Sequence, residues 1–182
     1  FPSQGLTTTY DSSSIITDSA SAGTAIATGN KTASGVINMD PGKTLKFKTI
    51  AEYAKEMGWK VGVVSNVSLD HATPASFYAK VPSRGDMYSI ATQLVASGFD
   101  YFGGSGFAQP RGKKGDQADV LAIAREAGYR IVNTADGFRK LDAASAGKVI
   151  AINETLQDSE AMPYEIDRHP DEDICHGRVV WW

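Results

Sequence analysis

The sequence predicts an α/β fold, in which a largely parallel central sheet is flanked by helices. Helix-like and strand-like stretches alternate along the chain, and glycine separates several of them. Hydrophobic residues make up 42% of the 182 residues and charged residues 21%, which is ordinary for a globular protein. This length and composition are enough for one domain with a real core.

The expected elements follow one another in a simple order. Small residues after Ser19 predict a short helix that ends at Gly29 or Asn30. A second helix is expected within residues 44–58, because its apolar residues recur on one face, which carries Ile50, Tyr53, Ala54 and Met57. Residues 59–67 predict a strand. Beyond it, helical patterns recur around 74–80, 86–97, 116–127 and 135–143, and strand patterns at 99–103, 129–133 and 148–153.

The net charge, the apolar runs and the number of cysteines exclude several classes of protein. The formal net charge is −3, so no general attraction to nucleic acid or to an anionic membrane is expected. No apolar run approaches the ~20 residues that a membrane helix needs. Cys175 is the single cysteine, so no disulfide can form within the chain. The start at Phe1 and the terminal Trp181 and Trp182 lead us to expect a piece of a longer protein.

The stretch ITDSASAGTAIATG, residues 16–29, allows two interpretations of Ser19. Ser19 either caps the helix that follows, or it is a nucleophile at the helix N-terminus, where free N–H groups favour an anion. A serine nucleophile must be activated by a base, a lowered pKa or a metal. The histidines that could serve as a base are His71, His169 and His176, and no G-x-S-x-G elbow surrounds Ser19.

The loop and helix at residues 69–84 form the second candidate. Thr73 is expected to be the N-cap of a helix, with Pro74 as its first residue. Asp70, His71 and Thr73 are expected to stand together on the loop, where hydroxyl and carboxylate oxygens suit Mg²⁺. Arg84 could clamp a phosphate with two parallel hydrogen bonds. A capped helix with a solvated histidine and arginine is the simpler alternative.

The segment PGKT, residues 41–44, offers a weaker alternative function. Gly42, Lys43 and Thr44 match the end of a nucleotide-binding P-loop, but the first glycine of that motif would fall on Ile37. A loop that enters a helix at Thr44 explains the segment without any nucleotide.

Together, these stretches resemble the alkaline phosphatase family, and most closely its bacterial branch. The resemblance rests on TDSASAGTAIATG, on the strand and DHATPASFYA that follow, and on the SR dipeptide, and it extends to YFGG (101–104) and AMPYEIDR (161–168). It implies an incomplete three-layer sandwich over residues 1–174. It also implies metal-dependent hydrolysis of phosphate monoesters through a covalent phosphoserine.

The resemblance assigns a role to each candidate site residue. Ser19 corresponds to the nucleophile and to a ligand of one zinc ion, while a second zinc ion activates the leaving oxygen. Arg84 corresponds to the arginine that grips the phosphate, and Asp18 to the acid that orients it. Thr73 corresponds to a ligand of a magnesium ion, which His71 would reach through a metal-bound water.

The resemblance also implies what the chain lacks. Most of the family's zinc ligands find no match here, and His169 and His176 stand at other positions. The chain by itself is therefore expected to be inactive, and a non-catalytic fragment of the same fold is the alternative. Residues 175–182 depart from the family and are expected to be a non-native tail after a shift of reading frame. A periplasmic or secreted location and a homodimer follow from the resemblance alone.

Overall fold

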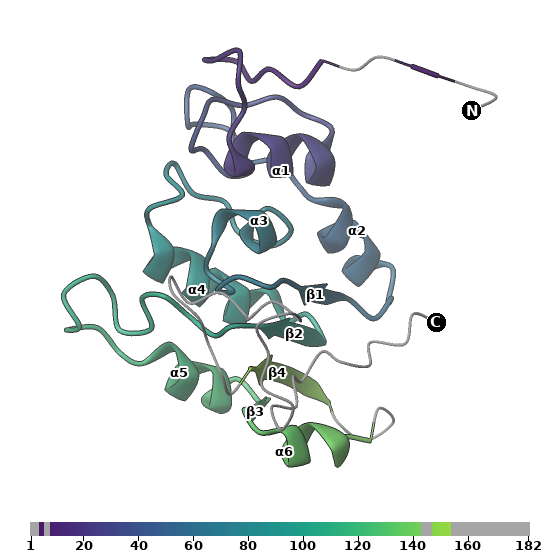
Figure 1. Ribbon diagram of the computed structural model, residues 1–182, viewed down its shortest axis with the longest axis vertical. Coiled ribbons are helices and arrows are strands. Elements are labelled where there is room, and N and C mark those ends of the chain that lie inside the picture. Colours follow the sequence, from purple (N-terminus) through teal and green to yellow (C-terminus); the bar gives the residue numbers. More distant parts are fainter. Residues whose placement is uncertain (1–3, 6–7, 143–146, 154–182) are drawn as a thin grey trace.

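The computed structural model describes residues 4–5, 8–142 and 147–153, and these confirm the predicted α/β class (Figure 1). The sheet has four parallel strands in the order β1-β2-β4-β3. Each strand overlaps a stretch for which the sequence predicts one. The strands are β1 (Gly62–Val64), β2 (Tyr101–Gly104), β3 (Tyr129–Val132) and β4 (Lys148–Ile152).

The helices in the described residues are α1 (Ser19–Thr28), α2 (Ile50–Glu56), α3 (Ala72–Ala75), α4 (Met87–Ser97), α5 (Val120–Glu126) and α6 (Ala135–Arg139). Each of them lies within or overlaps a predicted helical stretch. None of these helices is long and apolar enough to span a lipid bilayer.

The two faces of the sheet are covered by different helices. Phe102 and Ile150 are buried in the main core together with apolar residues of α4 and α5. Val149, the neighbour of Ile150, belongs instead to a smaller cluster that Phe138 of α6 packs against. Because successive residues of a strand point to opposite faces, the sheet forms the middle of three layers.

The helices α2, α3, α5 and α6 are shorter than the stretches predicted for them, and for two of these the structure shows why. The helix expected over 74–80 stops at Ala75, because the amide of buried Asn38 donates to the carbonyls of Ser76 and Ala79, which a longer helix would use. The helix expected over 44–58 begins only after Thr49, which caps it. The expectation that the PGKT loop leads directly into a helix at Thr44 is therefore also wrong.

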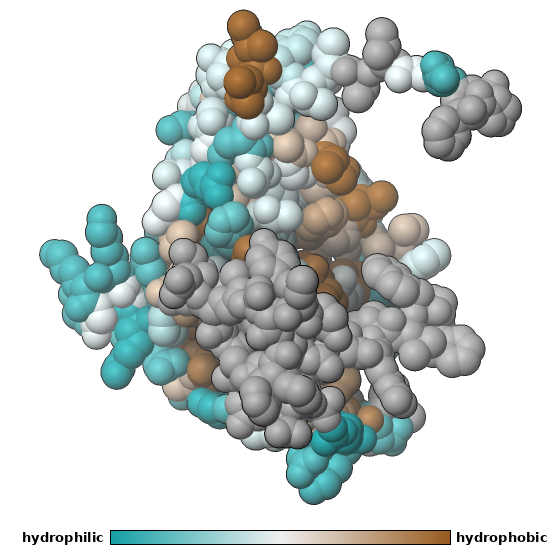
Figure 2. Space-filling model, viewed as in Figure 1, coloured by the Kyte–Doolittle hydropathy of each residue, from teal (hydrophilic) through white to brown (hydrophobic). Residues whose placement is uncertain are grey.

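The apolar face of α2 is open to solvent in the described part of the chain. Ile50 is 65% exposed, Tyr53 53% and Met57 69%, and Trp59, just beyond the helix, is 66% exposed. Figure 2 shows a hydrophobic surface over this region. The sequence predicted that Ile50, Tyr53 and Met57 share one helix face, and the structure adds that this face is exposed. An uncovered surface of this kind favours association.

The small residues of α1 allow it to lie very close to α3. Ala20, Thr24 and Ala27 are buried, and a side chain at Gly23 would collide with that of Ser76. The helix ends at Gly29, whose φ of 73° suits glycine, as predicted. The close packing explains the composition of the stretch and fixes the direction in which the helix N-terminus points.

Asp100, in the turn before β2, ties this turn to α2 and β1. It accepts hydrogen bonds from Lys55 at 2.7 Å, from Lys60 at 3.0 Å and from the backbone of Val61 at 3.0 Å. Burial alone would raise the pKa of Asp100, but these bonds lower it to about 2. The carboxylate therefore contributes stability above the usual pKa of an aspartate, and that stability is lost as the pH falls through about 2.

We expect Asp100→Asn to lower the free energy of unfolding by about 1 kcal/mol at neutral pH. Below about pH 4 the difference in the free energy of unfolding between the variant and the parent should shrink. In this range Asp100 binds a proton in the unfolded parent but not yet in the folded parent. Urea unfolding at neutral and acid pH measures it, with the exposed Asp116→Asn as control. A difference that stays constant with pH would contradict this account.

Candidate active site

The N-terminus of α1 leaves the hydroxyl of Ser19 free. Asp18 is the N-cap, and its Oδ1 accepts the backbone N–H of Ser21 at 3.0 Å. Ser19 is the exposed first residue of the helix, and its hydroxyl makes no hydrogen bond to the residues described. The interpretation of Ser19 as a cap is therefore wrong. Its hydroxyl stands at the positive end of the helix dipole.

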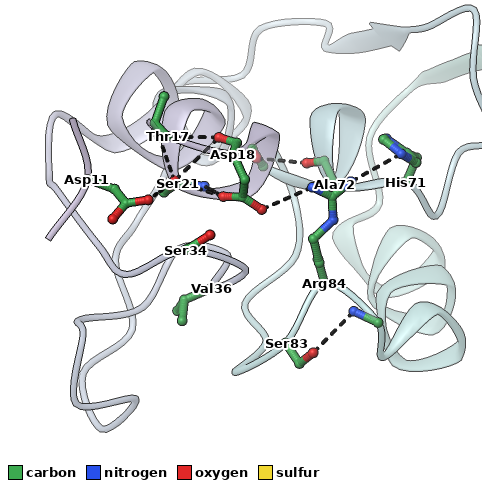
Figure 3. A network of polar contacts seen from close by, with 12 residues as sticks. Asp11, Thr17, Asp18, Ser21, Ser34, Val36, His71, Ala72, Ser83 and Arg84 are labelled. Carbon is green, nitrogen blue, oxygen red and sulfur yellow. Dashed lines mark hydrogen bonds and ion pairs between the residues drawn. The ribbon is translucent and has the colours of Figure 1, made fainter. Parts of the chain in front are cut away.

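Arg84 connects this helix terminus with the loop that follows β1 (Figure 3). Its Nη1 donates to Oδ2 of Asp18 at 3.0 Å, and its Nη2 lies 3.2 Å from Nε2 of His71. The backbone N–H of Arg84 donates to the carbonyl of Gly35 at 2.7 Å. Across the described residues, the remaining N–H groups of the guanidinium have no partner, so they can bind an anion.

Asp18 is held as a carboxylate. Burial alone would raise its pKa, but hydrogen bonds from Ser21, the backbone of Gly35 and Arg84 outweigh burial and hold the pKa well below its usual value. At neutral pH its charge balances that of Arg84. Gly35 therefore touches both partners of the ion pair, because it also accepts the backbone N–H of Arg84.

His71 meets Arg84 as a neutral ring. Burial lowers the pKa of His71 and the charge of Arg84 lowers it further, with a partial offset from Asp70. Because a guanidinium only donates, Nε2 accepts and the ring proton lies on Nδ1. Nδ1 is buried and has no partner among the described residues. An N–H donor suits a water molecule and not a metal ion, which needs a lone pair.

Asp70 does not join its neighbours in the predicted cluster. Its side chain is fully buried, and its two oxygens accept the backbone N–H groups of Ala108 and Gln109, each at 3.0 Å. The expectation that Asp70 stands with His71 and Thr73 as a metal-binding group is therefore wrong. Asp70 instead fixes the loop that follows β2 to the loop that follows β1.

Thr73 is not the N-cap of its helix, contrary to the prediction. His71 occupies the cap position of α3 without a side-chain bond, and Thr73 is an exposed residue in the first turn. Pro74 lies at the third helical position, where its missing N–H costs nothing, since no intrahelical acceptor exists there. Thr73 thus keeps an exposed hydroxyl.

The segment PGKT does not form a phosphate-binding loop. The carboxylate of Asp40 accepts the backbone N–H groups of Gly42, Thr44 and Leu45. These are the groups that would cradle phosphate in a P-loop, and here they already have a partner. Lys43 is exposed in this turn, and the following helix begins six residues after Thr44 at Ile50. The geometry contradicts the nucleotide-binding alternative.

The described residues do not complete a metal site. No group of three or more His, Cys, Asp or Glu side chains in residues 4–5, 8–142 and 147–153 is arranged to hold a metal ion. A catalytic zinc takes about three protein ligands. The two zinc ions that the resemblance implies therefore do not fit these residues alone. For magnesium, the chain offers the hydroxyl of Thr73 and the Nδ1–H of His71 toward a bound water.

Further polar groups, which we did not predict, lie on the side of Asp18 away from Arg84 (Figure 3). The hydroxyl of Ser21 lies 2.8 Å from Oδ1 of Asp18, 2.7 Å from the hydroxyl of Thr17 and 3.2 Å from Oδ2 of Asp11. The place of Ser21 three residues after the N-cap was a usable signal, because a cap binds the backbone there. The contact between His71 and Arg84 had no comparable signal in the sequence.

Some expectations fall outside the described residues. They are the AMPYEIDR segment at 161–168, the roles of His169 and His176, and the non-native tail at 175–182.

Comparison with known proteins places these features in a family. Residues 1–175 match the family model described as alkaline phosphatase. The repressible alkaline phosphatase of Saccharomyces cerevisiae is 31% identical over 185 residues, which cover 92% of this chain and 32% of that protein. Alkaline phosphatase 4 of Bacillus subtilis is 46% identical over 81 residues, or 44% of this chain and 17% of that protein.

Solved structures show the same likeness. Alkaline phosphatase from the Antarctic bacterium TAB5 matches with a TM-score of 0.76 and 36% identity, over 90% of this chain and 46% of that chain. A variant of the TAB5 enzyme with Mg bound in the M3 site matches with a TM-score of 0.76 and 35% identity, over 90% of this chain and 45% of that one. The chain thus spans less than half the length of these relatives.

The fold and the matched sequence agree with each other. The parallel sheet and its flanking helices recur in the solved phosphatases at this identity, and the family model extends over nearly the whole chain. The stretch that opens α1 and the loop that carries His71 lie within the matched region. On this evidence, the chain belongs to the alkaline phosphatase family.

Proposed function

We propose that this chain carries the nucleophile and phosphate-binding part of a phosphatase that hydrolyses phosphate monoesters through a covalent phosphoserine. The observation that supports it best is the ion pair between Asp18 and Arg84, at 3.0 Å, beside the free hydroxyl of Ser19. The candidate nucleophile thus directly follows the carboxylate that binds Arg84, at a helix terminus that favours anions.

In the proposed reaction, Oγ of Ser19 attacks the phosphorus atom and the bond to the alcohol breaks, which leaves phosphoserine and a free alcohol. Water then attacks the phosphoserine, releases inorganic phosphate and restores the hydroxyl. Arg84 holds the non-bridging oxygens with its unpartnered N–H groups and offsets the charge that gathers on them. Asp18 keeps Arg84 in place throughout, because its carboxylate stays ionised.

The metals of the proposed enzyme are two zinc ions and one magnesium ion. When bound, zinc would supply the activation that the hydroxyl of Ser19 needs, since no residue in the described part of the chain bonds to that hydroxyl as a base. Because the described residues do not form a zinc site, we propose that most ligands come from parts of the enzyme that this chain lacks. The chain alone should therefore be inactive.

The metal content of the chain tests this proposal directly. Residues 1–182 are purified, dialysed against zinc and magnesium, and assayed with a chromogenic phosphate monoester at alkaline pH, beside a complete phosphatase that contains them. We expect far less than stoichiometric zinc and no turnover in the chain alone, and both zinc and turnover in the complete enzyme. The Ser19→Ala form of each protein is the control.

Two outcomes would count against the proposal in different ways. Stoichiometric zinc with Ser19-dependent turnover in the chain alone would show that it needs no further ligands. A complete protein that binds zinc without hydrolysing the ester would favour the alternative, a non-catalytic protein of the same fold.

Membership of the family supports three further parts of the proposal. The substrates are phosphate monoesters, and the net charge of −3 gives no reason to expect specific binding of nucleic acid. The enzyme is periplasmic or secreted, and it is a homodimer. Gel filtration of the complete protein tests the last of these.

A further inference from the structure

A buried hydroxyl lies between two carboxylates behind the candidate site (Figure 3). Oγ of Ser21 is 2.8 Å from Oδ1 of Asp18 and 3.2 Å from Oδ2 of Asp11. On a third side it lies 2.7 Å from the hydroxyl of Thr17. Ser21 and Asp11 are both buried.

The proton of Ser21 can serve only one carboxylate well at a time. A serine hydroxyl has a single hydrogen, and its shorter carboxylate contact is with Asp18. The bond to Thr17 then runs from Thr17 to Ser21. Asp18 consequently receives two bonds from the same residue on Oδ1, one from the backbone and one from the hydroxyl of Ser21. Its other oxygen, Oδ2, is left for Arg84.

Asp11 is itself firmly fixed. Its Oδ1 accepts the backbone N–H groups of Ser13 and Ser14, each at 2.7 Å. The hydroxyl of Ser14 lies 2.9 Å from its Oδ2 and 2.7 Å from the carbonyl oxygen of Ile16. Burial alone would raise the pKa of Asp11, but these bonds lower it to about 2, so it is ionised at neutral pH. A fixed negative charge therefore faces the hydroxyl of Ser21 from the side away from Asp18.

The turn at residues 11–14 is bound to the loop that also holds the ion pair. The backbone N–H of Ser12 donates to the carbonyl of Thr32 at 2.9 Å, and that of Ser34 donates to the hydroxyl of Ser13 at 2.9 Å. The next residue, Gly35, contacts both Asp18 and Arg84 through its backbone. Hydrogen bonds thus connect three segments around Asp18: the turn at residues 11–14, the loop at residues 32–35 and the start of α1.

We propose that Ser21, which accepts a hydrogen bond from Thr17 and donates one to Asp18, is a positioning residue that orients the carboxylate of Asp18 and, through it, Arg84. This inference rests on the proposed phosphatase function. Without the hydroxyl of Ser21, one oxygen of Asp18 loses a hydrogen bond and Asp11 repels it across the gap. Asp18 then turns, and Arg84 loses the geometry in which it meets phosphate.

A double-mutant cycle in the complete, metal-loaded enzyme tests the proposal. The inhibition constant for inorganic phosphate is measured in the parent, in Ser21→Ala, in Arg84→Ala and in the double variant. Ser21→Ala should weaken phosphate binding about 3- to 30-fold in the parent background. In the Arg84→Ala background it should have no further effect, because the residue that Ser21 positions is gone.

Thr28→Ala is the matched control. Thr28 is a hydroxyl residue of the same helix, and within the described part of the chain it bonds only to that helix and its C-terminal turn, with 2.7 Å to the carbonyl of Thr24. It should leave phosphate inhibition unchanged. Alanine favours the helix, so Ser21→Ala should fold, and circular dichroism checks this.

The outcomes separate this proposal from the proposed function. A Ser21→Ala enzyme that binds phosphate like the parent, or that weakens binding equally with and without Arg84, would overturn the positioning role alone. Phosphate binding that is indifferent to Arg84→Ala would overturn the proposed function, and the positioning role with it.

Discussion

Replacement of Ser19 by alanine should lower phosphomonoester turnover by at least about a thousandfold in the complete, metal-loaded enzyme. The reason is that the covalent intermediate forms on this oxygen, and among the described helices only α1 has a hydroxyl residue directly after an N-cap aspartate. The fold should not change, since the hydroxyl of Ser19 is exposed and makes no hydrogen bond within the described residues. The free energy of unfolding should stay within about 0.5 kcal/mol of the parent.

Two measurements make this result specific. After brief reaction with a phosphate-labelled ester and an acid quench, the label should remain on the parent protein and not on the Ser19→Ala form. Ser12→Ala, at another exposed serine, should retain both label and turnover. Turnover close to that of the parent in a clean Ser19→Ala preparation would remove Ser19 from the mechanism.

The second large effect should come from Arg84. We expect Arg84→Ala to slow turnover, and to weaken inhibition by inorganic phosphate, by roughly one to three orders of magnitude, because a charged bidentate contact to phosphate is lost. Arg84→Lys should recover only part of the loss, since an ammonium lacks the planar fork. Steady-state kinetics with phosphate as inhibitor measures both effects.

The control for Arg84 is Arg111→Ala. Arg111 is an exposed arginine in the loop after β2, and its removal lowers the net charge by the same amount. It should leave phosphate inhibition unchanged. Equal effects of the two substitutions would show that Arg84 acts only through overall charge, and an unchanged inhibition constant in Arg84→Ala would exclude its phosphate-binding role.

Local sequence patterns predicted where the helices and strands occur better than they predicted how long each one is. The strands predicted from the apolar runs at β2, β3 and β4 are confirmed. A strand buried between two layers of helices needs apolar residues, so its sequence is easy to recognise. The lengths failed where a side chain from elsewhere claimed backbone groups. Asn38 ends α3 by binding carbonyls that follow it, and no local pattern reveals a donor so distant in the chain.

The site shows the same division. That Ser19 begins a helix could be predicted from the small residues after it and from Gly29. The ion pair of Asp18 with Arg84 joins residues 66 positions apart, and only the family resemblance pointed to it. The placement of Asp70 failed for a physical reason: a buried carboxylate needs donors, and it found them on the backbone of another loop.

The exposed side of α2 also provides an optical probe. Trp59 follows that helix with 66% of its surface in water, near the uncovered Met57. Indole emission moves to shorter wavelength when water is excluded. Any segment that binds over this side of α2 should therefore shift the emission maximum of Trp59 to shorter wavelength. With Trp181 and Trp182 replaced by phenylalanine, the remaining tryptophan reports that event alone, and stopped-flow emission would give its rate.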